Sequence, residues 1–176
     1  MNGRGSIGKS SRVAKGGMLA GLAFVIMWSA NLFPTLSYTL AAAASLCVMV
    51  SVIEMGRKYA FVVYAASAIL TALLAQAVPD TAVMYIAIFG HYPIVKSWLE
   101  NRMMPRKVEL VAKYVAFDLS LVVACLILFF VLRIPVEGGL WMALALIVFA
   151  NVGFYIYDRL LSILATQYVL RFKNKL

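Results

Sequence analysis

Three polar side chains interrupt long apolar stretches of this chain, at positions where they could bind a solute or relay a proton. His91, Asp118 and Asn151 lie in three different apolar runs. At about 1.5 Å per residue, each lies roughly 12–18 Å from one end of its run, so the three reach a similar depth. We expect His91 to pair with Asp118, with Asn151 completing the hydrogen bonds, because ionisable groups at membrane depth are costly unless paired. Such a layer is either a working site or a brace that fixes helix register, and the sequence leaves both open.

A second polar group lies near one set of ends of the apolar runs. The members of this group are Asn31, Tyr38, Tyr85, Arg133 and Trp141. We predict that these five residues contact a solute together with His91, Asp118 and Asn151. Tyrosine and tryptophan are also common where a helix meets the membrane interface. Glu137 follows Arg133 by four residues, so this arginine either forms an ion pair or binds an anion.

Catalytic and metal-binding patterns are not found. The chain has no GxSxG or HExxH motif, and one histidine with two cysteines inside apolar runs offers too few soft ligands for a metal. Residues 3–10 satisfy the phosphate-loop pattern GxxxxGK[ST]. That pattern works only behind a strand, which we do not expect here, so a basic tail is the prediction. We therefore expect no enzyme activity and no cofactor.

The elements that must position these residues are membrane helices. The chain is 64% hydrophobic and 13% charged, with a mean hydropathy of +0.93. A soluble protein of this length could not bury so much apolar surface in its own core. At about 20 residues per span, we predict an all-α polytopic integral membrane protein in the lipid bilayer, with six transmembrane helices at 16–33, 35–54, 58–78, 81–98, 110–134 and 139–160. Gly90 and Pro93 predict a kink in the fourth span.

The basic residues predict the orientation of these spans. All but one of the 16 Lys and Arg residues fall in the terminal segments, in the second and fourth loops or beside them, and the exception is Arg133. Because basic loops stay in the cytoplasm, both termini are expected there, in the cell membrane. Residues 1–15 and 166–176 form basic tails around a membrane domain at 16–165. Topology explains the net charge of +9, so we expect no nucleic-acid partner.

Small residues in the first span form two interleaved pairs, Gly16 with Ala20 and Gly17 with Gly21. Pairs at this spacing let another helix approach closely. The neighbour is either a helix of the same chain or a separate membrane subunit.

The predicted architecture resembles the substrate-binding S component of energy-coupling-factor (ECF) vitamin transporters. The shared features are six helices in a chain of this length, cytoplasmic ends, a small-residue stripe on the first helix and polar residues at the outer ends. The resemblance covers the whole chain at the level of architecture. The family's AxxxA signature is absent from the first helix, so Gly17 and Gly21, or Gly16 and Ala20, would take its place. The resemblance implies that a vitamin-like solute binds from outside, and that a transmembrane coupling subunit driven by ATPase subunits docks on the chain.

Two other classes of protein fit the same spans. A small structural or scaffolding membrane protein needs no cavity, and a proton-coupled carrier would use His91 and Asp118 as its relay. A closed outer cavity favours the S component, filled space favours the scaffold, and a wet path through the His91 layer favours the carrier.

Overall fold

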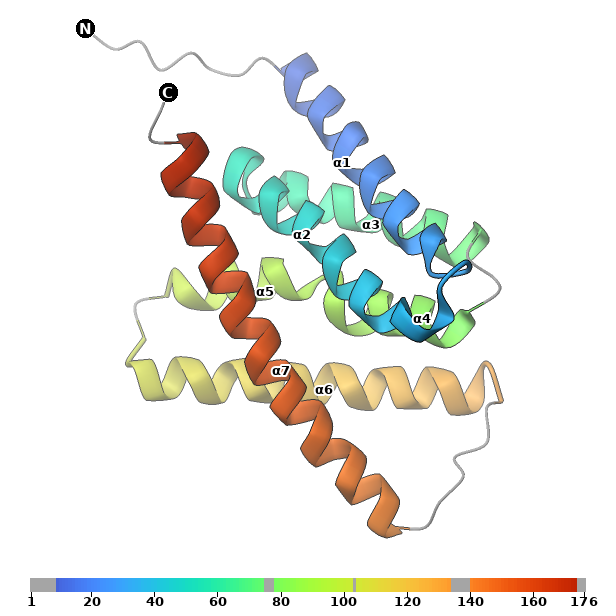
Figure 1. The fold of residues 1–176 in the computed structure, drawn as a ribbon. Helices are drawn as coiled ribbons and strands as arrows, with labels where there is room; N and C mark the ends of the chain where they lie inside the picture. Colours follow the sequence, from blue (N-terminus) through green and yellow to red (C-terminus); the bar gives the residue numbers. More distant parts are fainter. Residues whose placement is uncertain (1–8, 75–77, 103, 134–139, 174–176) are drawn as a thin grey trace, which may run out of the picture.

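The computed structural model describes residues 9–74, 78–102, 104–133 and 140–173, and these residues are helical with short connections and contain no strand. The described residues form five long helices and a divided sixth segment (Figure 1). The long helices are α1 (Lys9–Ser29), α2 (Ser37–Met55), α3 (Arg57–Leu74), α6 (Arg106–Phe130) and α7 (Leu140–Tyr168). The shorter elements are η1 (Pro34–Leu36), α4 (Pro79–Met84), the π-helical turn η2 (Tyr85–Phe89), α5 (Tyr92–Glu100) and a second π-helical turn, η3 (Val169–Lys173).

Four helical stretches of the described residues are long and apolar enough to cross a membrane, namely Pro34–Met55, Arg57–Leu74, Arg106–Phe130 and Ala145–Arg171. Helix α1 and the divided segment α4–η2–α5 occupy the places of the first and fourth predicted spans. The largest differences from the predicted boundaries are at the two outer ends, since α1 begins at Lys9, inside the expected tail, and α7 with η3 continues to Lys173. Helix α6 also begins and ends four residues earlier than the predicted 110–134. Charged residues end a membrane span, but lysine and arginine are good helix formers and do not end a helix.

Helices α1, α2 and α3 pack together through small side chains. Ala23, Ala41 and Ala44 are buried beside Met27 and Cys47, where alanine brings helix backbones close. A single residue, Gly56, separates α2 from α3 and has a φ of 87°. Glycine reaches this left-handed region without steric penalty, so it permits the abrupt reversal.

The expected kink in the fourth span is confirmed. Its helix is divided at Gly90 and His91, after the π-helical turn η2. A Cβ atom at position 90 would lie 2.7 Å from the ring of Tyr64 and 2.9 Å from the carbonyl oxygen of Tyr85, so only glycine fits. Pro93 has no N–H to bond the carbonyl four residues earlier. Both residues therefore contribute to the break.

Helices α6 and α7 cross one another and join the rest of the molecule through an aromatic cluster (Figure 1). Phe117 of α6 stacks on Phe154 of α7 with ring centroids 4.2 Å apart, and Tyr92 of α5 meets Phe154 edge-on at 5.0 Å. Much of the remaining surface of both helices is exposed and apolar. A protein in lipid can expose such a surface without penalty, because hydrocarbon tails are as apolar as leucine.

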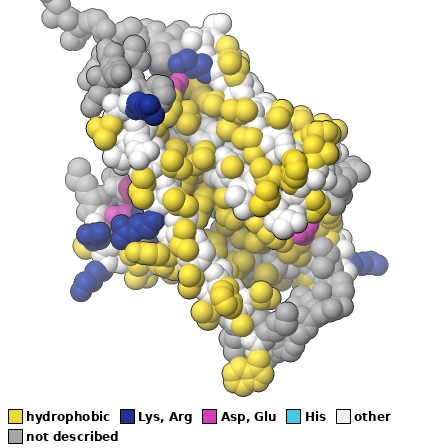
Figure 2. Space-filling model, in the orientation of Figure 1, with side chains coloured by type: hydrophobic (Ala, Val, Ile, Leu, Met, Phe, Trp, Pro, Cys, Tyr) yellow, Lys and Arg dark blue, Asp and Glu magenta, His cyan; other side chains and the backbone are white. Residues whose placement is uncertain are grey.

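Charged residues gather at one end of the bundle. In Figure 1, α1, α3 and α6 begin at this end, and α2, α5 and α7 finish there. Figure 2 shows most Lys and Arg side chains of that face on the same side of the molecule, with broad hydrophobic surface beyond them. At this end, hereafter the basic end, Lys15 of α1 pairs with Glu54 of α2 at 2.9 Å.

Candidate functional site

The described hydrogen bonds do not join His91 to Asp118, so the pair expected from the sequence is not formed. The Nε2 atom of His91 lies 3.2 Å from the Oγ of Ser120 instead. Ser120 and Asp118 are two residues apart on α6, which turns their side chains about 200° from one another around the helix axis. One imidazole on one side of α6 therefore cannot meet both.

Asp118 and Asn151 do meet, as the sequence predicted. The side-chain amide of Asn151 in α7 donates to the carboxylate of Asp118 at 3.2 Å and to the carbonyl oxygen of Ile147 at 3.0 Å. Asp118 is exposed on α6. The polar layer is thus two separate contacts on opposite sides of α6, one with α7 and one with the divided helix.

At the end of the bundle opposite to the basic end, Tyr38 forms a link that the sequence did not predict. Its hydroxyl donates to the carboxylate of Asp80 at 2.8 Å and joins the start of α2 to the start of α4. The side-chain oxygen of Asn31, between α1 and α2, is buried and has no hydrogen-bond partner among the described residues. An unsatisfied buried acceptor of this kind can accept a hydrogen bond from a water molecule.

The other predicted outer residues do not converge. Tyr85 is fully buried, and its hydroxyl lies 2.8 Å from the Oγ of Ser67 in α3. Trp141 is 84% exposed near the start of α7. Arg133 has a φ of 51°, a left-handed conformation just beyond the end of α6. Glu137, its suggested partner, lies outside the described residues.

A cavity of about 350 Å³ lies between α2, the α4–η2 segment, α6 and α7. We call it the apolar cavity, and its described wall is formed by Tyr38, Thr39, Ala42, Met84, Ile88, Phe89, Phe117, Leu121, Ala150, Gly153, Phe154, Ile156, Tyr157 and Leu160. These residues include no carboxylate, imidazole, thiol or amine. Its polar groups are the hydroxyls of Tyr38, Thr39 and Tyr157, and the last is already 2.7 Å from the Oγ of Ser45. Such a wall suits a small, mainly apolar molecule with few hydrogen-bonding groups.

Sequence reasoning found only Tyr38 among the residues of this wall. The others are ordinary apolar and aromatic residues of helices, and neither their types nor their spacing distinguishes a cavity wall from a packed core. The crossing of α6 and α7 brings them together. Gly153 marks the site most directly, because a Cβ atom there would meet nothing within 4 Å.

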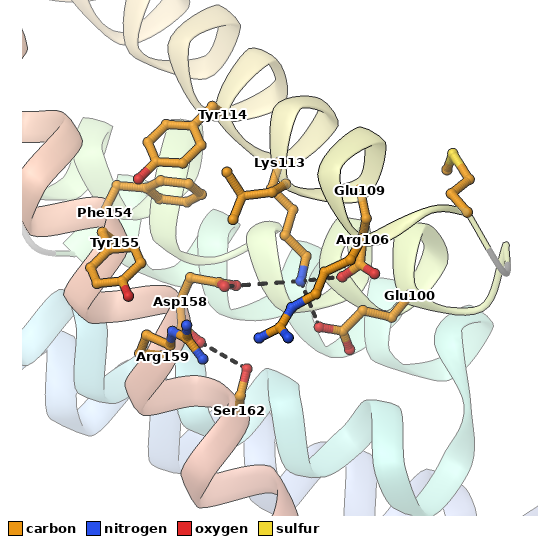
Figure 3. Close-up of a pocket in the computed structure, with 12 residues that line it drawn as sticks. Glu100, Arg106, Glu109, Lys113, Tyr114, Phe154, Tyr155, Asp158, Arg159 and Ser162 are labelled. Carbon is orange, nitrogen blue, oxygen red and sulfur yellow. Dashed lines mark hydrogen bonds and ion pairs between the residues drawn. The ribbon is translucent and has the colours of Figure 1, made fainter.

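A cluster of charges between α5, α6 and α7 at the basic end was also missed. Figure 3 shows Lys113 extending from α6 toward carboxylates of α5, α6 and α7. Its Nζ atom lies 2.7 Å from both Glu100 and Glu109 and 3.9 Å from Asp158. Lys96 of α5 forms a direct ion pair with Asp158. The spacings of four residues, Glu109–Lys113 and Lys96–Glu100, are typical of ion pairs on one helix face. The sequence explains both lysines equally well by membrane orientation, so it does not identify the cluster.

This cluster holds three helices together where α7 leaves the bundle. The hydroxyl of Tyr92 donates to the carboxylate of Asp158 at 2.6 Å, so α5 supplies both a cation and a donor to one acid of α7. Lys96 is 6% exposed and Lys113 is 7% exposed. Charges this buried are kept by their partners, and the cluster fixes the position of α7 against α5 and α6.

The two pairs of small residues in α1 have different surroundings. A Cβ atom on Gly16 would lie 3.5 Å from the side chain of Val63 in α3, and Ala20 is buried beside α3. Gly17 and Gly21 have nothing within 4 Å of such an atom. The first pair is internal packing, whereas the second leaves a flat strip on the outer surface of α1.

The described part of the chain holds no set of side chains arranged to bind a metal ion. No group of three or more His, Cys, Asp or Glu side chains is placed to hold a metal ion among those residues. Cys47 is buried, Cys125 is exposed, and both are free thiols. The phosphate-loop pattern lies almost entirely outside the described residues.

Comparison of the chain with protein-family models, with characterised proteins and with solved structures finds no match.

Proposed function

We propose that this protein is a membrane-embedded solute-binding subunit of an uptake transporter, and that the apolar cavity is its solute site. The cavity itself carries the proposal. Its volume of about 350 Å³ falls in the range of small-molecule pockets, and its wall is apolar with three hydroxyl groups. The wall favours a small aromatic or aliphatic solute with one or two polar atoms, and it offers no group for acid–base or nucleophilic catalysis.

The proposed orientation places the cavity within reach of the outside of the cell. Six helical segments, including α1 and the divided fourth, would cross the bilayer with both termini in the cytoplasm. The gathering of Lys and Arg at the basic end supports this orientation, since basic ends stay in the cytoplasm (Figure 2). Tyr38 and Thr39 of the cavity wall lie at the start of α2, at the opposite end.

The exposed strip of α1 is the proposed contact with a coupling subunit. Gly17 and Gly21 leave room for a close helix–helix approach, and the large apolar side chains around them are exposed. This arrangement suits docking of a transmembrane partner driven by ATPase subunits, as the resemblance to ECF S components implies. No residue of the strip lines the apolar cavity, so solute binding and docking can be tested separately.

Filling the cavity tests the solute site. The purified protein would be screened by thermal unfolding in detergent against vitamin-like and other small apolar solutes, and a hit would be measured again in Gly153→Leu. A leucine there enters open space, so we expect a folded protein that no longer binds. Gly17→Leu is the matched control, since it also enters open space but lies outside the cavity and should bind normally.

The result also separates the proposal from a scaffolding role. A scaffold does not need the cavity, so Gly153→Leu would then raise stability and leave the cell phenotype unchanged. Equal solute binding by Gly153→Leu and the unsubstituted protein would place the solute elsewhere and refute this assignment of the site.

A further inference from the structure

A second cavity, of about 440 Å³, opens at the basic end between α6 and α7, and we call it the basic-end cavity. Its polar part is formed by the carboxylates and lysine of the charged cluster and by Arg106, Arg159 and Ser162. Its apolar wall includes Leu110, Tyr114 and Tyr155, which follow α6 and α7 toward the middle of the bundle. The cavity is therefore amphipathic along its length.

The charges of this cavity are unevenly paired. Lys96 and Lys113 satisfy Glu100, Glu109 and Asp158 among themselves. Arg106 and Arg159 form no ion pair with any residue that the structure describes, and both line the cavity between α6 and α7 (Figure 3). The guanidinium carbon of Arg159 lies 5.4 Å from the centroid of the Tyr155 ring, in a cation–π contact. Lys96 belongs to the charged cluster but not to the cavity wall. The cluster and the two arginines together hold four cations and three carboxylates, a net charge of +1.

Two arginines on neighbouring helices suit an oxyanion such as a phosphate. A guanidinium group donates two parallel hydrogen bonds to the oxygens of a phosphate, and two such groups can hold a phosphodiester from two sides. A phosphodiester carries one negative charge, which would neutralise the net charge of the cluster and the two arginines together. The position of the cavity matches as well, because basic pockets between helices at the cytoplasmic membrane surface suit lipid headgroups.

The wall below the arginines supplies the other half of a lipid. Leu110 and Tyr155 are each 46% exposed on the outer surface of the crossing helices, where acyl chains would lie against them. A soluble phosphate ester would gain nothing from this apolar extension.

We propose that the basic-end cavity binds an anionic phospholipid, with Arg106 and Arg159 holding its phosphate and the α6–α7 surface contacting an acyl chain. The bound lipid would fill the gap between α6 and α7 where they diverge from their crossing. This site lies apart from the apolar cavity, so the proposal stands whether or not the protein binds a solute.

The test is lipid-dependent thermal unfolding of the purified full-length protein in a neutral detergent. Short-chain phosphatidylglycerol, phosphatidylcholine with the same acyl chains, and inorganic phosphate are titrated separately. Phosphatidylglycerol should raise the unfolding temperature at the lowest concentration. In Arg106→Gln/Arg159→Gln its apparent affinity should fall about 30-fold, the effect of two basic residues at a membrane surface.

The matched control is Arg57→Gln/Lys58→Gln, which removes two exposed charges from the same end of the bundle but outside the cavity. It should change the affinity less than threefold or so, because it alters only the general surface charge. Arg106→Lys/Arg159→Lys keeps the charge but loses the paired hydrogen bonds, so its affinity should fall between those of the unsubstituted protein and the glutamine variant. This graded result guards against a folding defect in the glutamine variant.

Three results would overturn the proposal. Equal losses in the glutamine variant and in the control would show nonspecific attraction to surface charge. Equal stabilisation by phosphatidylcholine would show that the anionic group is not recognised. The full effect with inorganic phosphate alone would identify a free phosphate site and exclude the lipid. As an independent readout, native mass spectrometry should find co-purified anionic lipid on the unsubstituted protein and on the Arg57→Gln/Lys58→Gln control, and little on the Arg106→Gln/Arg159→Gln variant.

Discussion

The hydroxyl of Tyr157 in α7 donates a hydrogen bond to the backbone carbonyl of Phe89 at 3.3 Å. This is the carbonyl that Pro93, four residues later, cannot bond. The same hydroxyl lies 2.7 Å from the Oγ of Ser45 in α2. A side chain of α7 thus compensates for the break in the divided helix, and it lines the apolar cavity while doing so.

Tyr157→Phe should destabilise the protein by about 1–3 kcal/mol, because the part-buried carbonyl of Phe89 loses its donor and Ser45 loses a partner. The measurement is unfolding in detergent, followed by circular dichroism. Tyr155→Phe on the same helix is the control and should have little effect, since that side chain is 46% exposed. Adding Pro93→Ala restores a backbone N–H, so the effect of Tyr157→Phe should shrink in that background. Simple additivity would show that the hydroxyl does not serve this carbonyl.

Lys96→Met should destabilise the protein by about 3–5 kcal/mol, because it leaves Asp158 without its closest cation. Lys96→Met combined with Asp158→Leu removes both charges and should recover most of that stability. Lys107→Met removes an exposed lysine near the start of α6 and should change the unfolding free energy by no more than about 0.5 kcal/mol. No recovery in the double variant would mean that the pair does not hold α5 to α7.

Gly16→Leu and Gly17→Leu should behave differently although the residues are neighbours. Leucine at position 16 would overpack the contact with Val63, at a cost of about 1–3 kcal/mol in unfolding free energy. Leucine at position 17 meets nothing within the chain and should leave the isolated protein stable. It should instead abolish co-purification with a coupling subunit. If both variants fail to accumulate in the membrane, the strip of Gly17 and Gly21 is internal packing and the docking proposal fails.

Double-mutant cycles should separate the two polar contacts of α6. His91→Gln and Ser120→Ala should be coupled by about 0.5–1.5 kcal/mol, since their side chains are hydrogen bonded. His91→Gln and Asp118→Asn should be additive within about 0.5 kcal/mol. Coupling between His91 and Asp118 would restore the proton relay as a candidate. Transport that keeps its pH dependence in His91→Gln would argue against that relay independently.

The orientation can be tested with single cysteines, after the exposed native Cys125 has been replaced by alanine. In intact cells, an impermeant thiol reagent should label Asp80→Cys, and it should label Arg106→Cys only after permeabilisation. Labelling of Arg106→Cys in intact cells would reverse the proposed orientation.

Several features of the fold were predictable because each depends on neighbours in the sequence. The all-helical class follows from apolar runs of membrane length, and the break in the fourth helix follows from Gly90 and Pro93. The helix ends were less accurate. Lys9 and the residues after Tyr168 are helical because charge stops a helix from crossing lipid without stopping the helix itself.

The candidate sites were far less predictable. Depth along a span placed Asp118 near Asn151 correctly, but depth says nothing of the direction in which a side chain points. His91 therefore contacts Ser120, which follows Asp118 by two residues and lies on the other side of α6. Tyr85 had the residue type expected of a solute contact, yet it is buried against Ser67 of α3.

By itself, the sequence determined that this is an all-helical protein with spans of membrane length, and that its basic residues lie at one set of helix ends. Those properties follow from hydrophobicity and charge along the chain. Only the tertiary structure decided where the cavities are and which charges line them. Both cavities are lined by α6 and α7 near their crossing. The place of α7 depends on the contacts of Phe117 with Phe154 and of Lys96 of α5 with Asp158, and the partners in each contact are far apart in the sequence. No local pattern specifies such contacts, so the proposed solute site and the proposed lipid site emerge only from the packed helices.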